Sequence, residues 1–167
     1  MATGRWDTYL TVEGITGESK RSGHEGQIDL EAFSFGGSNP SSVGRGGGGG
    51  TGTVSLSSFN IMKKTDASSA ELFQKMCAGE HFPTAKITMY VSGGSAGAVE
   101  KVLFEFEEVF VESIQWSGSE GSDSVIPSES VSFAFGKVTI TYNEQNADGT
   151  VGGAHVGVWD IRSGVAA

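Results

Sequence analysis

The sequence predicts a mainly β protein, a closed antiparallel β-barrel with one short α-helix packed on it. Most of the chain alternates between apolar and polar residues with period two, as half-buried strands do. The apolar phase changes partway along three segments, which indicates bent strands, and helical spacing occurs in only one segment. The 167 residues include 26 glycines and three prolines, a composition typical of many turns.

The clearest alternation occurs in two short segments. In "KITMYV" the residues Ile87, Met89 and Val91 share one face, and in "TYLTVEGI" Leu10 and Val12 do so. Alternating side chains of a strand point to opposite faces, so each segment is expected to bury one face against the core.

The three segments with a phase change are IDLEAFSF (28–35), TVSLSSFNI (53–61) and SVSFAFGKVTITY (130–142). In the third, the change falls at Gly136. A bulge or a barrel corner changes the phase of a strand in this way, so three changes favour a closed, sharply bent sheet. Strands with two buried faces would give a similar pattern.

The segment "TDASSAELFQKMCAGE" (65–80) is predicted to form a helix of about ten residues. Ser68 and Glu71 have the spacing of a capping box, and Gly79 lies where a C-terminal cap belongs. The apolar stripe expected to face the barrel consists of Leu72, Phe73, Met76 and Cys77.

Length and charge limit the function classes. The length suits a single domain over residues 1–167, with a glycine-rich loop at about 36–52. Cys77 is the one cysteine, so an internal disulfide is impossible, as suits a reducing cytosol. We expect no signal peptide and no membrane insertion, because the N-terminus and the rest of the chain lack the apolar runs required. The net charge of −9 argues against nucleic acid as a partner.

The sequence "GGSAG" (93–97) matches the G-x-S-x-G motif of serine hydrolases, with Ser95 as the nucleophile. Asp123 or Asp148, followed by His155, would complete a triad in that chain order. Such an elbow requires a helix after the serine, whereas the segment that follows alternates and is rich in valine and phenylalanine, which favours a strand. We therefore expect no catalytic residues, and an esterase-like hydrolase stays as an alternative.

No cofactor or metal is expected. The glycine run after Val43 is followed by a strand and has no Gly-Lys-Ser/Thr ending, so it does not resemble a phosphate loop. The three histidines lack the spacing of metal ligands. A carbohydrate-binding β-module is a further alternative, suggested by the tryptophans. These are Trp6, Trp116 and Trp159.

The chain resembles Hcp, the tube-forming protein family of bacterial type VI secretion systems, over nearly its whole length. The resemblance rests on segments 12–36, 63–87, 106–142 and 157–162. They include "VEGITGESKRSGHEGQIDLEAFSFG", "KKTDASSAELFQKMCAGEHFPTAKI" and "GVWDIR". One departure is Ala70, where family members often have proline; alanine is a good helix former there. The sequence does not distinguish the Hcp family from the tail-tube proteins of related contractile injection machines.

The resemblance implies a β-barrel with one helix that forms hexameric rings, which stack into a tube. It implies sheath, spike and baseplate proteins as partners, with small effectors carried in the lumen. It also implies assembly in the cytoplasm, followed by expulsion of the tube from the cell without a cleavable signal peptide.

Two sets of site residues follow from the resemblance. The glycine-rich loop is expected to contact the next ring in the stack, since glycine permits close backbone approach. Its candidates are Arg45, Gly46, Gly47, Gly48, Gly49 and Gly50. Ser34 points opposite to Phe33 and Phe35 and is a candidate for the lumen; the alternative is an ordinary small residue at a bulge.

Overall fold

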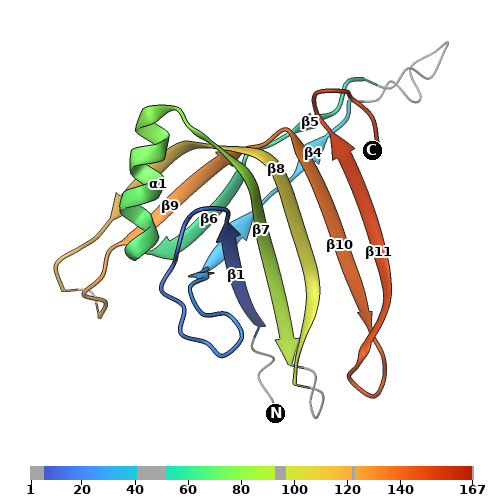
Figure 1. The fold of residues 1–167 in the computed structure, drawn as a ribbon, viewed down its shortest axis with the longest axis horizontal. Coiled ribbons are helices and arrows are strands. Elements are labelled where there is room, and N and C mark those ends of the chain that lie inside the picture. Colours follow the sequence, from blue (N-terminus) through green and yellow to red (C-terminus); the bar gives the residue numbers. More distant parts are fainter. Residues whose placement is uncertain (1–5, 41–51, 93–96, 122, 167) are drawn as a thin grey trace.

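A computed structural model describes residues 6–40, 52–92, 97–121 and 123–166, and its fold is mainly β with one α-helix (Figure 1). That part of the prediction is confirmed. The elements are β1 (Trp6–Val12), β2 (Ile28–Asp29), β3 (Ala32–Ser34), β4 (Gly37–Ser38), β5 (Ser55–Leu56), β6 (Phe59–Lys64), α1 (Ala67–Ala78), β7 (His81–Ser92), β8 (Ala98–Ser117), β9 (Ser128–Ala134), β10 (Lys137–Gln145) and β11 (Val151–Asp160).

The strands form one large antiparallel sheet and a two-stranded ribbon. Hydrogen-bonded neighbours in the large sheet follow the order β2-β1-β7-β8-β9-β6-β3. Strand β10 also pairs with β8, and β11 pairs with β10, so the sheet branches at β8. The ribbon consists of β4 and β5.

Two of the three predicted phase changes coincide with breaks between strands, and the first, between Ala32 and Phe33, lies one residue beyond a break. Residues 30–31 separate β2 from β3, 57–58 separate β5 from β6, and 135–136 separate β9 from β10. At the first two breaks the chain changes its sheet partners, and at the third it stays paired with β8 while its other neighbour changes from β6 to β11. A change of apolar phase therefore marks the point where a strand leaves one neighbour for another.

The branch in the sheet is formed at Glu108 of β8. Before this residue β8 pairs with β10, and after it β8 pairs with β9. Glu108 has a φ of 53°, in the left-handed region. Gly136 lies opposite, and a Cβ there would be 3.3 Å from the Cβ of Glu108. The glycine therefore permits the close approach that the branch requires.

Arg162 joins this branch to the C-terminal turn. Its guanidinium contacts the carboxylates of Glu108 and Asp160. The backbone N–H of Ser163 and the side chain of Arg162 donate to Asp160, and these hydrogen bonds hold the pKa of Asp160 below its usual value.

The sheet is not closed into a barrel by hydrogen bonds within the described residues, so the prediction of a closed barrel is only partly confirmed. The path of paired strands ends at β2 and β3. These end strands are consecutive along the chain, and the two residues between them contact opposite ends of the path. The N–H of Leu30 donates to the carbonyl of Thr8, and the N–H of Glu31 donates to that of Met62. The covalent backbone thus joins the two ends.

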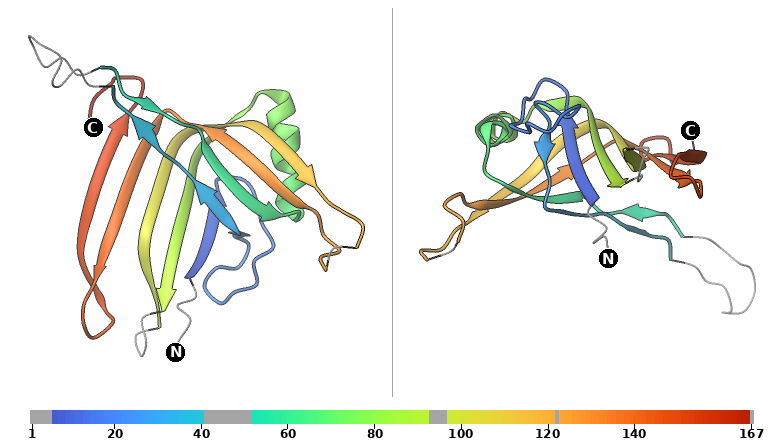
Figure 2. Two further views of the ribbon diagram at one scale, coloured as in Figure 1. Left: turned by 180° about the vertical axis from the view of Figure 1, so that it is seen from behind. Right: turned by 90° about the horizontal axis from the view of Figure 1, so that it is seen from below.

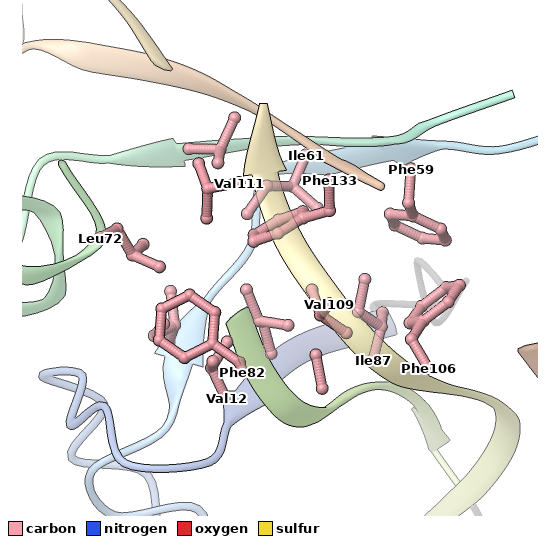
Figure 3. Close-up of a cluster of buried hydrophobic side chains, with 14 of the residues drawn as sticks. Val12, Phe59, Ile61, Leu72, Phe82, Ile87, Phe106, Val109, Val111 and Phe133 are labelled. Carbon is pink, nitrogen blue, oxygen red and sulfur yellow. The ribbon is translucent and has the colours of Figure 1, made fainter. Parts of the chain in front are cut away.

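The core lies between two layers of this sheet. In Figure 2, β3 and β6 cross over β7 and β8, and the view from below separates β6 from β1 and β7. Figure 3 shows Phe59 and Phe133 of one layer facing Phe106 and Val109 of β8. The rings of Phe59 and Phe106 are 4.8 Å apart in a T-shaped arrangement.

The helix is two residues longer than the predicted ten and is capped differently. Asp66, not Ser68, is the N-cap residue, and the capping box joins Asp66 to Ser69. Gly79 ends the helix in the left-handed conformation, as predicted. The sequence alone does not identify Asp66 as the N-cap. Asp and Ser both accept hydrogen bonds from helix N–H groups, and both residue types occur within positions 66–69.

The predicted apolar stripe of α1 is wrong for two of its four residues. Leu72 is fully buried, and Met76 packs partly against the core. Phe73 is 44% exposed and contacts Trp116, and Cys77 is exposed, not part of the core. The apolar face by which the helix packs is therefore narrower than predicted. Two polar residues of the helix, Ser68 and Ser69, are buried as well.

A buried ion pair fixes the start of α1 to the sheet. The ammonium of Lys63 is completely buried and lies 2.7 Å from Oε1 of Glu129, which is also completely buried. It also lies 2.7 Å from Oδ1 of Asp66 and donates to the hydroxyl of Ser69 and the carbonyl of Lys64. Removing one partner of such a pair leaves a buried charge without compensation.

We predict that Lys63→Met lowers the free energy of unfolding by about 3–5 kcal/mol, because Glu129 then remains buried without its counter-charge. The double variant Lys63→Met/Glu129→Met should recover most of this loss. Lys64→Met, at a partly exposed position, is the matched control and should differ little from the wild type. Urea unfolding followed by circular dichroism measures all three; equal loss in the single and double variants would contradict the account.

Candidate functional site

Four strands present a continuous outward surface that is rich in serine and has one charged residue, and we call it the serine-rich face. Its members alternate with core residues along β3, β6, β9 and the second half of β8, and they lie opposite one another in register. The face consists of Ala32, Ser34, Asn60, Met62, Lys64, Ser113, Gln115, Ser117, Ser128, Ser130 and Ser132.

Ser34 lies on this face. It is exposed and pairs with Asn60, and the adjacent Phe33 turns inward and stacks on Phe59 at 5.8 Å. The predicted outward direction of Ser34 is therefore present in the structure. Its place in a lumen stays a prediction.

The serine-rich face carries no carboxylate, although the chain has 20 acidic residues. Lys64 is its one charged member. The outward surface of the opposite layer differs, because it carries cross-strand ion pairs. Lys86 lies 2.7 Å from Glu105, and Lys137 lies 3.3 Å from Glu107. The two outward surfaces thus have different chemistry, and only the serine-rich face is nearly neutral.

The ends of the predicted glycine-rich loop are held together, whereas the loop candidates themselves lie outside the described residues. Strand β4 pairs with β5, and the N–H of Gly52 donates to the carbonyl of Pro40 at 2.7 Å. Arg45 and Gly46–Gly50 fall between these two ends in the sequence. Pro40 and Gly52, the described residues that flank this segment, therefore lie side by side near the β4–β5 ribbon.

Strand β11 has an unpaired edge in the part of the chain that the structure describes. It pairs with β10 from Ala154 to Asp160 and again at Val151, with a register shift between these two parts, and Asp160 also forms an isolated bridge with Val165. Val151 and Val156 of this strand are 51% and 62% exposed, and Tyr142 of β10 is 43% exposed. An open edge beside exposed apolar side chains is a surface to which another strand can add.

The described candidates for the alternative hydrolase site, His155 and Asp148, have other partners than a triad would give them. Ser95 lies outside the described residues, and the segment after it is the strand β8 instead of the helix that an elbow requires. His155 contacts Oε1 of Glu144 at 2.7 Å, and Asp148 accepts from Thr150. These partners differ from those of a Ser-Asp-His triad.

The three tryptophans do not form a common platform. Trp6 contacts Phe33, Trp116 contacts Phe73, and Trp159 packs against the core. Among the described residues no cluster of three or more histidine, cysteine, aspartate or glutamate side chains is placed to hold a metal ion. None of the described helices has the length and hydrophobicity needed to cross a membrane.

Of the serine-rich face, the sequence pattern identified only Ser34. A further signal is present in "SESVSFA", where Ser128, Ser130 and Ser132 alternate with Glu129 and Val131. The inward residues of this segment identify it as a strand, and the serines between them form its outward surface. Lys64 belongs to the same polar phase of β6, directly after the buried Lys63.

Comparison with known proteins places this fold in a family. A family profile described as "Type VI secretion system effector, Hcp" matches residues 9–142. Protein hcp1 of Pseudomonas aeruginosa is 36% identical over 162 residues, covering 96% of this chain and 98% of that protein. The chain belongs to the Hcp family. It is thus a protein of the type VI secretion system and is secreted by it.

Solved structures agree with this assignment. A type six secretion system protein has a TM-score of 0.89 at 28% identity, covering 98% of this chain and all of the other. Hcp1 from Salmonella typhimurium has a TM-score of 0.79 at 23% identity, covering 97% and 99%. The latter supports the fold alone. Together with the family match, these similarities support a β-rich tube component.

We predict that the exposed serines contribute little to folding. Ser34→Gln and Ser130→Gln should each change the free energy of unfolding by less than about 0.5 kcal/mol, because both side chains are exposed. Ser69→Ala should cost about 1–3 kcal/mol, because its buried hydroxyl contacts Lys63 and Glu129. Urea unfolding curves compare the three; a large loss in either glutamine variant would make the face structural.

Proposed function

We propose that this chain is the tube subunit of a type VI secretion machine and folds as one domain over residues 1–167. Six copies form a ring, rings stack into a tube in the cytoplasm, and a contracting sheath expels the tube. Sheath, spike and baseplate proteins are its partners, and small effector proteins travel in the lumen. Family membership supports this proposal, and the open edge of β11 is the structural observation that carries it.

The edge of β11 suits ring formation because it is long and regular from Ala154 to Asp160, and its one register irregularity lies between Val151 and Ala154. Its ten residues contain no proline and no lysine, and Val151 and Val156 are exposed beside the edge. A neighbouring copy that adds a strand there would satisfy the free backbone groups and cover these side chains. A contact of this heterologous kind closes into a ring when the rotation between copies permits it.

The test of ring formation is the solution mass of the purified chain by size exclusion with light scattering, followed by negative-stain imaging of the peak. A mass near six chains together with open rings is expected. A monomer at micromolar concentration, with no ring in the images, would contradict the proposal.

The glycine-rich loop has a separate role in stacking. Its base, formed by β4 and β5, lies at one extremity of the molecule (Figure 1), a place where a neighbouring ring could make contact. Glycines permit the backbone to approach another surface closely.

We predict that replacing Arg45–Gly50 by a two-residue Gly-Ser turn leaves single rings intact and shortens or abolishes tubes, because the contact between rings is lost while the ring edges remain. Negative-stain imaging and sedimentation of tubes measure the change. Tubes of normal length from the deleted variant would exclude the loop as the stacking contact.

The serine-rich face is proposed to line the lumen. A passage must bind cargo weakly enough to release it, and hydroxyl and amide groups offer hydrogen bonds without a fixed charge. Ser34 lies on this face, and a larger side chain there would project into the passage.

We predict that Ser34→Gln keeps rings and loses co-purification of a small effector co-expressed from the same secretion system. Thr11→Gln is the matched control, because Thr11 is exposed on β1 in the opposite layer. Ring images and the molar ratio of effector to ring are the two measurements. Equal retention by both variants would remove Ser34 from the lumen.

A further inference from the structure

A cavity of about 420 Å³ opens at one end of the serine-rich face, beside the segment that joins β8 to β9. Its polar lining comes from Lys64 and four serines. The serines are Ser117, Ser119, Ser124 and Ser128. Hydroxyl groups and an ammonium are donors to an anion, and no carboxylate is among the residues that line the cavity.

The ammonium of Lys64 can still donate to a ligand. It donates to the hydroxyl of Ser128 at 2.8 Å and forms an exposed ion pair with Glu31, whose Oε1 is 3.6 Å away and too distant for a hydrogen bond. An ammonium has three N–H groups, so hydrogen-bonding capacity is left after the contact with Ser128. The neighbouring Lys63 differs, because its ammonium is buried among four acceptors.

Apolar side chains form the other part of the lining. Val125 is 97% exposed and Ile126 is 47% exposed, and both border the cavity that contains Lys64. A simple inorganic anion makes no use of branched apolar side chains. A ligand with an anionic group attached to an apolar side chain would contact both parts.

We propose that this cavity binds the C-terminal carboxylate and the apolar last residue of a polypeptide carried in the tube. Lys64 and the hydroxyls of Ser117, Ser119 and Ser128 would donate to the carboxylate, and Val125 and Ile126 would contact the last side chain. The hydroxyl of Ser124 already donates to the carbonyl of Ile126. A polypeptide fits better than inorganic phosphate, because phosphate has no apolar part that could contact Val125 and Ile126. The inference rests on the proposed function, in which the serine-rich face lines the lumen.

Saturation-transfer-difference NMR tests the proposal on the assembled wild-type protein. The probes are the peptide N-acetyl-Gly-Ser-Leu with a free C-terminal carboxylate and the same peptide ending in a carboxamide. We expect the leucine methyl signals of the free acid to be at least fivefold stronger than those of the amide. Lys64→Met should abolish this preference and Lys64→Arg should keep it, because arginine retains the positive charge.

Lys86→Met is the matched control. Lys86 is 51% exposed and lies on the opposite layer, so its replacement changes the net charge of the chain equally without touching the cavity. The preference for the free acid should survive in this variant. Equal signals from acid and amide with the wild type, or a preference that persists in Lys64→Met, would overturn the proposal.

Two further measurements separate the polypeptide site from a general anion site and from a failure of the tube itself. Sodium acetate and inorganic phosphate, each at tenfold excess over the peptide, should displace it poorly; complete displacement by either would mean a general anion site and refute the polypeptide assignment. Ring images of every variant keep the two proposals apart. Rings that show no preference for the free acid would refute the site alone, whereas a preference without rings would refute the tube alone.

Discussion

The whole architecture depends on one constraint, which is that β8 must serve two sheet layers with a single strand of 20 residues. Strand β7 accompanies β8 from Ala98 to Phe110, but the partner on its other side changes from β10 to β9 at Glu108. The strands β9 and β10 therefore need a bend at the same level, and Gly136 supplies it. The left-handed conformation of Glu108 and the absence of a side chain at Gly136 together permit this bend.

The corner also decides which residues reach solvent together. Once β8 has crossed it, outward residues of β8 align with those of β9 and β6, and this alignment creates the serine-rich face. Before the corner, outward residues of β8 align with β7 and β10, where lysine and glutamate form cross-strand pairs. One strand thus contributes to two surfaces of different chemistry. A flat sheet would have merged them into one.

The sequence predicted the elements well because periodicity records burial directly. The phase changes at 28–35, 53–61 and 130–142 located three bends, since each bend exchanges the inward and outward residues. The sequence could not show which strands meet at the bends, because pairing depends on contacts distant along the chain. The helix stripe failed for a related reason: Phe73 has the correct spacing to be buried but contacts exposed Trp116 at the end of β8. Helical spacing specifies a face, and the neighbouring strand determines how much of that face is covered.

The lysine pair Lys63 and Lys64 shows why a site is harder to predict than a fold. Both residues have the same side chain, but alternation along β6 sends the first inward and the second outward. Lys63 occupies the apolar phase of Phe59 and Ile61, and Glu129 occupies that of Val131, so an ion pair across two strands could have been inferred from register. Lys64 is a candidate binding residue only because it lines a cavity with Ser117 and Ser128, and segments distant along the chain form this cavity. Burial can be deduced from a local pattern, whereas binding requires groups that only the completed fold brings together.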